Sequence, residues 1–152
     1  MFLLNLLTAL SFADDLNYDW RWEKYASPNI EICPDSDLSV QKVDQIIDYW
    51  LDRGVNVNID TVKRVEYCDM SKFGVIQITG YRDFNIKRYH AMTDIKWHYY
   101  GVRSEDTIYY IDRVHIQLPN DALDNRPVVL HEFGHALGLG HSNDFIMKRR
   151  HD

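Results

Sequence analysis

The segment HEFGHALGLGH, residues 131–141, constrains this chain more than any other stretch, because it brings three histidines and a glutamate together. If its first part is helical, His131 and His135 are one turn apart and lie on the same face. Two imidazoles placed in this way can bind one metal ion, and nitrogen ligands in tetrahedral geometry favour zinc. Glu132 projects about 100° around the helix from His131, where it can reach a water on the metal without being a ligand.

The third histidine, His141, needs a different backbone path. In a continuous helix it would lie about 9 Å along the axis from His135 and point elsewhere. We therefore expect Gly138 and Gly140 to adopt left-handed backbone angles that end the helix and return the third imidazole to the same ion. Three protein ligands leave the fourth zinc position open to water, as in catalytic sites. Zinc can lower the pKa of that water to about 7, and Glu132 can accept its proton, which predicts metal-assisted amide hydrolysis.

The first residues have the pattern of an export signal. Residues 2–10 are apolar, no charged side chain precedes Asp14, and the small residues Ser11 and Ala13 suit cleavage after Ala13. The apolar run is shorter than the about 20 residues that span a bilayer. We predict a signal peptide over residues 1–13, a secreted location (extracellular or periplasmic) and no transmembrane anchor. The alternative is a first core helix or strand.

Export gives a meaning to the two cysteines, Cys33 and Cys68. An even pair in an oxidising compartment forms a disulfide by default. Such a bond would stabilise the fold by about 3 to 4 kcal/mol in the chain-entropy description. The alternatives are a free thiol that ligates a metal and a thiol switch.

Residues 14–28 are polar and aromatic without a clear period, and we expect an irregular lead-in there. Residues 29–152 then form one domain, because the hydrophobic fraction of 45% is ordinary and the chain is too short for two comfortable cores. The net charge of −6 argues against nucleic acid as a partner.

The hydrophobic pattern gives the order of elements in this domain. Ile30 and Ile32 alternate with polar neighbours, as in a short strand. A long helix follows within residues 36–54, capped by Asp37 or Ser39 and ended by Gly54. Its predicted apolar stripe consists of Val40, Val43, Ile47, Trp50 and Leu51. Strands are expected over residues 61–68, 74–81 and 107–119, residues 82–106 have no clear assignment, and the histidine helix comes last. This order predicts an α+β or α/β domain.

The histidine segment also carries a resemblance. H-E-x-x-H-x-x-G-x-x-H is the signature of the metzincin zinc endopeptidases, and residues 131–141 match each fixed position. Ser142, directly after the third histidine, resembles the matrixin branch. The segment NDFIM supplies Met147 for the family's tight methionine turn beneath the metal. The resemblance implies that the three histidines bind one zinc ion, that Glu132 is the general base and that Met147 forms the apolar floor of the site.

The resemblance also implies a zincin-like α+β fold: a small twisted mixed sheet, a long helix, a zinc-binding helix and a shortened C-terminal subdomain. In that fold the first two strands are neighbours, which brings Cys33 near Cys68 and favours their disulfide. The strand at residues 108–118 would correspond to the edge strand along the cleft, where extended substrate adds by main-chain hydrogen bonds.

Matrixins further bind calcium and a structural zinc ion ahead of the catalytic helix. The candidates by residue type are His90, Asp94, His98 and His115, although their spacing departs from the family pattern and favours solvated or cleft-lining histidines. The segment ICPDSD does not reproduce the family's cysteine latency motif. Another group that could block the zinc is a carboxylate of the lead-in, from Asp14, Asp15 or Asp19.

These observations together predict a secreted, monomeric zinc endopeptidase that hydrolyses peptide bonds in proteins or peptides. One alternative is an inactive zinc-binding interaction module on the same fold, which the shortened C-terminus favours and the presence of Glu132 disfavours. Another is a structural component of a secreted assembly in which protease activity serves processing.

Overall fold

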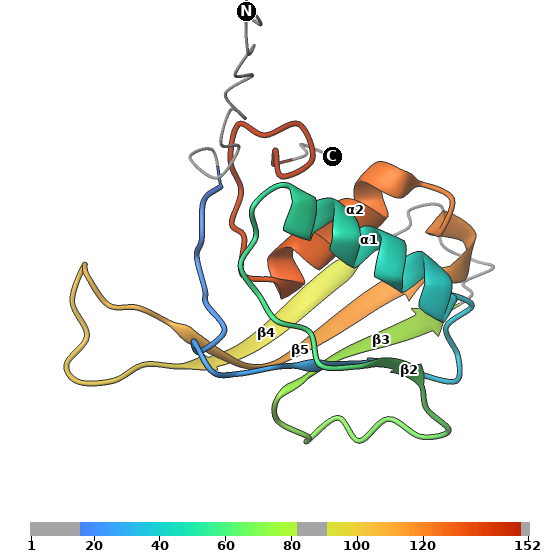
Figure 1. Cartoon of the computed structure of the whole chain (residues 1–152), viewed down its shortest axis with the longest axis horizontal. Coiled ribbons are helices and arrows are strands. Elements are labelled where there is room, and N and C mark those ends of the chain that lie inside the picture. Colours follow the sequence, from blue (N-terminus) through green and yellow to red (C-terminus); the bar gives the residue numbers. More distant parts are fainter. Residues whose placement is uncertain (1–15, 82–90, 150–152) are drawn as a thin grey trace, which may run out of the picture.

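In the computed structural model, residues 16–81 and 91–149 are described, so that the predicted signal peptide lies outside the described residues. The elements in chain order are β1 (Asn29–Ile32), α1 (Val40–Asp52), β2 (Val62–Arg64), β3 (Val75–Tyr81), β4 (Met92–His98), β5 (Tyr110–Pro119), the short 3-10 helix η2 (Asn120–Ala122) and α2 (Arg126–Ala136). The strands form one mixed sheet in the order β2-β1-β3-β5-β4, in which only β4 runs antiparallel to its neighbour. Both helices lie on the same side of the sheet (Figure 1). This arrangement confirms the predicted small α+β fold of the zincin type.

The core lies between the sheet and the two helices. It is formed by the apolar side chains that occur at every second position along the strands. Ile30 and Ile32 of β1 are fully buried, and so are Ile76 and Ile78 of β3. In β5, Val114, Ile116 and Leu118 are buried while His115 and Gln117, on the other face, are only partly covered, as the sequence pattern predicts. β5 thus presents an apolar face to α2, the helix that carries His131 and His135.

Helix α1 begins where the sequence indicated. The side chain of Ser39 accepts a hydrogen bond from the backbone N–H of Lys42, and Gly54 follows the helix with a φ of 94°. The apolar stripe is rotated relative to the prediction. Val40 and Leu51 are partly exposed, and the core instead takes up Ile46.

The edge of the sheet beside α2 is β4, and this corrects the prediction that residues 108–118 form it. β5 lies inside the sheet, parallel to β3 on one side and antiparallel to β4 on the other. β4 falls in the stretch without an assignment, because Asp94, Lys96 and Trp97 of this edge strand break the apolar alternation that marks a covered strand.

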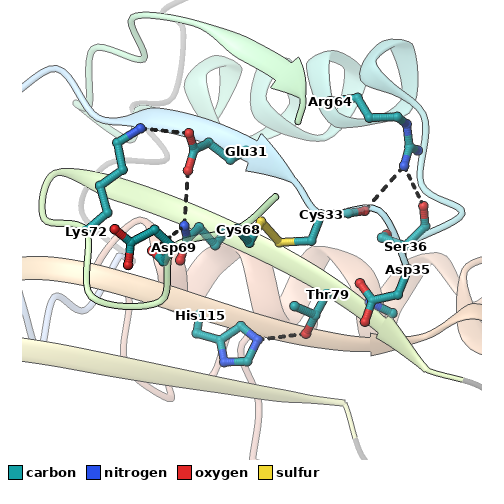
Figure 2. The surroundings of a disulfide bond; sticks show 12 residues. Glu31, Cys33, Asp35, Ser36, Arg64, Cys68, Asp69, Lys72, Thr79 and His115 are labelled. Carbon is teal, nitrogen blue, oxygen red and sulfur yellow. Dashed lines mark hydrogen bonds and ion pairs between the residues drawn. A yellow bond between two sulfur atoms is a disulfide. The ribbon is translucent and has the colours of Figure 1, made fainter. Parts of the chain in front are cut away.

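The predicted disulfide joins Cys33 and Cys68, with 5.6 Å between their Cα atoms (Figure 2). It is close to β1 and β2, which are parallel neighbours as the resemblance implied. β2 ends at Arg64 rather than near Cys68, and the Arg64 guanidinium donates hydrogen bonds to the backbone carbonyls of Cys33 and Ser36. The bond thus ties the loop after β2 to the end of β1. No helix in the described part of the chain is long and apolar enough to cross a membrane.

Candidate functional site

Three imidazoles meet where α2 ends. Asn125 caps the start of α2, and Pro127 occupies its first turn. His131 and His135 follow on one face, with ring centroids 4.6 Å apart. The His141 ring lies 5.3 Å from that of His131 and 4.8 Å from that of His135. One nitrogen of each ring lies within 4.8 Å of the others, and these three residues are the one group of metal-binding donors found among the described residues.

The hydrogen bonds of the first two rings determine which nitrogens face the centre of the group. Nδ1 of His131 lies 2.7 Å from the carbonyl oxygen of Ile146, and Nδ1 of His135 lies 2.7 Å from that of Leu139. Because a carbonyl only accepts, each Nδ1 donates, and in the neutral ring each Nε2 then presents a lone pair. The two Nε2 atoms are 3.0 Å apart. Two lone pairs at this separation repel each other unless a cation lies between them, so the donor set fits a metal ion.

The electrostatics of the site favour the metal-binding form of the rings. Burial is the main reason that the pKa of His135 is lowered to about 4, and the two neighbouring imidazoles add to the effect. Partial desolvation also lowers the pKa of the exposed His141, with a further contribution from His131. These rings are therefore neutral at neutral pH, which is the state in which an imidazole nitrogen can bind a metal.

The two glycines between His135 and His141 have different roles. Gly138 has a φ of 105° and turns the chain after α2, as predicted. Gly140 is not among the glycines with positive φ, so the prediction of a left-handed angle there is wrong. Gly140 instead leaves room for the Asp19 carboxylate, since a Cβ at this position would lie 2.2 Å from one of its oxygens unless that side chain moved. A contact between residues so far apart in the sequence cannot be predicted from the spacing of residues 131–141.

Glu132 lies beside the histidines and contacts the edge strand. Its side chain is buried, with 8% exposed. The hydroxyl of Thr93 in β4 lies 2.5 Å from Oε2 of Glu132 and 3.1 Å from its backbone carbonyl oxygen. A donated O–H···O⁻ bond of this length is strong and fixes the orientation of the carboxylate. Sequence reasoning missed Thr93, because a single threonine in an unassigned stretch gives no signal.

Met147 is buried against α2, and its role as the apolar floor of the metal site stays a prediction. It is 1% exposed, and a Cβ added to Gly134 would lie 2.4 Å from its sulfur atom. The turn that carries it is closed by Asp144, whose side chain accepts hydrogen bonds from the backbone N–H groups of Ile146 and Met147. Arg53, just after α1, forms an ion pair with Asp144. The same turn therefore also positions the carbonyl of Ile146, which accepts the hydrogen bond from Nδ1 of His131.

Of the other residues predicted to bind or block a metal, those that the structure describes do not join the three histidines. Nδ1 of His98 lies 2.6 Å from a carboxylate oxygen of Asp112, and Nε2 of His115 lies 2.7 Å from the hydroxyl of Thr79. His90 lies outside the described residues, as do Asp14 and Asp15. Asp19 is next to Gly140 but is not in the donor group. A second zinc ion, calcium and a blocking carboxylate stay predictions.

The comparison with protein families decides the class of this fold. A family model described as Matrixin matches residues 15–149. The chain belongs to the matrixin family. Matrixins are zinc metalloendopeptidases and are typically secreted proteins that act on protein substrates. A comparison with curated protein sequences finds no significant match. The matrixin assignment agrees with the histidine cluster, which could bind a metal, and with the disulfide.

Proposed function

We propose that this matrixin is an active, secreted zinc endopeptidase that hydrolyses peptide bonds in proteins. The observation that carries the proposal is the convergence of His131, His135 and His141, with two Nε2 atoms 3.0 Å apart and their Nδ1 atoms already bound to carbonyls. In this proposal the three imidazoles hold one zinc ion and leave one position to water, as in catalytic zinc sites. The predicted signal peptide and the disulfide support secretion.

Bound zinc would supply Lewis-acid polarisation of the scissile carbonyl and an acidified water. Glu132 acts as the general base: its carboxylate accepts a proton from the attacking water and returns it to the leaving amine. The Thr93 hydroxyl donates to Oε2 and so orients the carboxylate for these proton transfers. The carboxylate is buried beside the histidines, so its proton transfers take place away from bulk water.

The edge strand β4 supports a peptide as the substrate. An exposed edge strand can add an extended peptide through main-chain hydrogen bonds. β4 occupies the edge of the described sheet next to α2, and Thr93 of this strand contacts Glu132 directly. A peptide that pairs with β4 would therefore run beside the proposed base. This location replaces the edge predicted at residues 108–118.

The test is cleavage of a diverse peptide library with and without a metal chelator. We expect cuts within peptides that stop when zinc is removed and return when zinc is added back. The same cut sites should appear in both zinc-containing samples. Cuts that persist unchanged in the chelator would contradict the proposal. Zinc binding without any cleavage would instead support the interaction module.

Thr93 gives a second prediction, because it orients the base without touching the metal. Thr93→Val keeps the shape of the side chain and removes the hydroxyl that binds Glu132. We expect kcat to fall by about 10-fold, the lower end of the cost of losing an outer-shell partner, with KM nearly unchanged. Thr93→Ser should restore most of the rate. Steady-state kinetics on one peptide, with bound zinc measured in each variant, check this. An unchanged kcat in Thr93→Val would remove this role.

A further inference from the structure

We propose that residues 17–22 of the lead-in, here called the lead-in strap, position the loop that carries His141 and thereby set the affinity for zinc. The inference rests on the proposed zinc site and assigns a role to a segment that the catalytic steps do not use. His131 and His135 are fixed by helix α2, whereas His141 is exposed and follows the turn at Gly138. The position of the third ligand therefore depends on what holds this loop.

The backbone of the strap pairs with the backbone of the loop. The N–H groups of Asp19 and Trp20 both donate to the carbonyl of Gly138, at 3.0 and 3.2 Å. The N–H of Gly140 donates to the carbonyl of Asn17 at 2.7 Å. Tyr18 and Leu139 form an antiparallel bridge between these bonds. In Figure 1 the first described residues, in blue, run beside the red segment that follows α2. The loop thus has a partner strand along its length.

Two side chains of the strap extend this contact to both ends of the loop. The amide of Asn17 donates to the backbone carbonyl of His141 at 3.2 Å. The indole N–H of Trp22 donates to the carbonyl of Ala136 at 3.0 Å, in a buried position at the last turn of α2. That carbonyl is one of those that a helix end leaves without an intrahelical partner. The strap therefore binds the loop just where it leaves the helix and again at the third ligand itself.

The glycines of the loop fit the strap closely. A Cβ on Gly138 would lie 2.3 Å from the backbone oxygen of Trp20, and one on Gly140 would lie 2.2 Å from the carboxylate of Asp19. Gly138 consequently meets two demands, a positive φ and room for the strap. Because the strap lies against the loop and outside the donor group, it maintains the metal site rather than blocking it.

The test compares zinc affinities of two strap variants with two matched controls in the full chain. Asn17→Ala removes the bond to His141, and Trp22→Phe removes the bond to Ala136. Trp50→Phe is the control for Trp22→Phe, because its indole N–H also donates at 3.0 Å, in a buried position, to the α2 carbonyl of Leu130. Asn58→Ala, which loses an exposed bond to Ser27, is the control for Asn17→Ala.

Zinc affinity is measured by competition with a chromophoric chelator, and the unfolding midpoint of each zinc-free variant is measured alongside. We expect the two strap variants to bind zinc about 10-fold more weakly than the unaltered protein, as for outer-shell partners of other zinc sites. The two controls should bind it within about twofold, although Trp50→Phe lowers the unfolding midpoint as much as Trp22→Phe.

Equal zinc affinities for Trp22→Phe and Trp50→Phe, or a wild-type affinity for Asn17→Ala, overturn the inference. If Trp22→Phe does not fold, Asn17→Ala decides, because its side chain is exposed. The failure of the proposed function is distinct: in that case the unaltered protein binds no zinc or cleaves no peptide. Absence of zinc from the unaltered protein overturns both proposals, whereas zinc binding that is insensitive to the strap overturns only this one.

Discussion

Glu132→Gln is expected to lower kcat for peptide hydrolysis by about 10²- to 10⁴-fold, the range for loss of a general base, while bound zinc stays unchanged. Glutamine has the same shape, and its amide oxygen can still accept the Thr93 hydrogen bond. It cannot accept a proton from water at neutral pH, so only the proton transfer is lost. Steady-state kinetics on one peptide and a zinc determination on the same sample measure both quantities.

The control for this substitution is the zinc content together with the unfolding midpoint. A variant that keeps both and loses activity identifies Glu132 as the base. Equal activity in Glu132→Gln and the unaltered protein would exclude the proposed mechanism. Loss of activity together with loss of zinc would show that Glu132 shapes the site, and kcat would then not report on proton transfer.

His135→Ala is expected to have the larger effect on the metal. His135 is the central ring of the group, within 4.8 Å of each of the other two centroids, and its Nδ1 is fixed by Leu139. Loss of a direct ligand should weaken zinc binding by more than the about 10- to 100-fold cost of losing an outer-shell partner. Peptide hydrolysis should fall to the background rate, because two remaining imidazoles do not retain the ion at ordinary zinc concentrations.

The matched control is His115→Ala. His115 is a partly buried histidine of β5 that contacts Thr79 and lies outside the histidine group. It should keep both zinc and activity. If His115→Ala loses zinc as His135→Ala does, the loss in His135→Ala reflects damage to the fold and not removal of a ligand. Full zinc content in His135→Ala would contradict the assignment of that ring.

The part of the site that the sequence predicted is the part encoded by local spacing. His131, Glu132 and His135 occupy fixed positions on one helix, so the helical period alone gives their relative directions. The turn at Gly138 also follows from the conformational freedom of glycine. The core faces of β1, β3 and β5 were predictable for the same reason, because alternation along a strand is a local property.

The features that were missed depend on contacts between distant segments. The Asp19 carboxylate lies against Gly140, and nothing in the sequence near residue 140 indicates that contact. β4 has the mixed polarity of an exposed edge, which resembles a loop until its pairing with β5 is known. Thr93 became visible only when this strand was placed beside α2. The edge of the sheet was assigned wrongly. The resemblance pointed to residues 108–118 as the edge strand, and the sequence pattern could not show that this strand pairs with neighbours on both sides.

The central claim is that three imidazoles of this chain hold one zinc ion, and metal analysis of the purified protein tests it most directly. We expect elemental analysis to find one zinc ion per chain. X-ray absorption at the zinc edge should show three imidazole nitrogens at about 2.0–2.1 Å, together with one further light ligand. Absence of stoichiometric zinc, or a zinc ion coordinated by fewer than three imidazoles, would contradict the account.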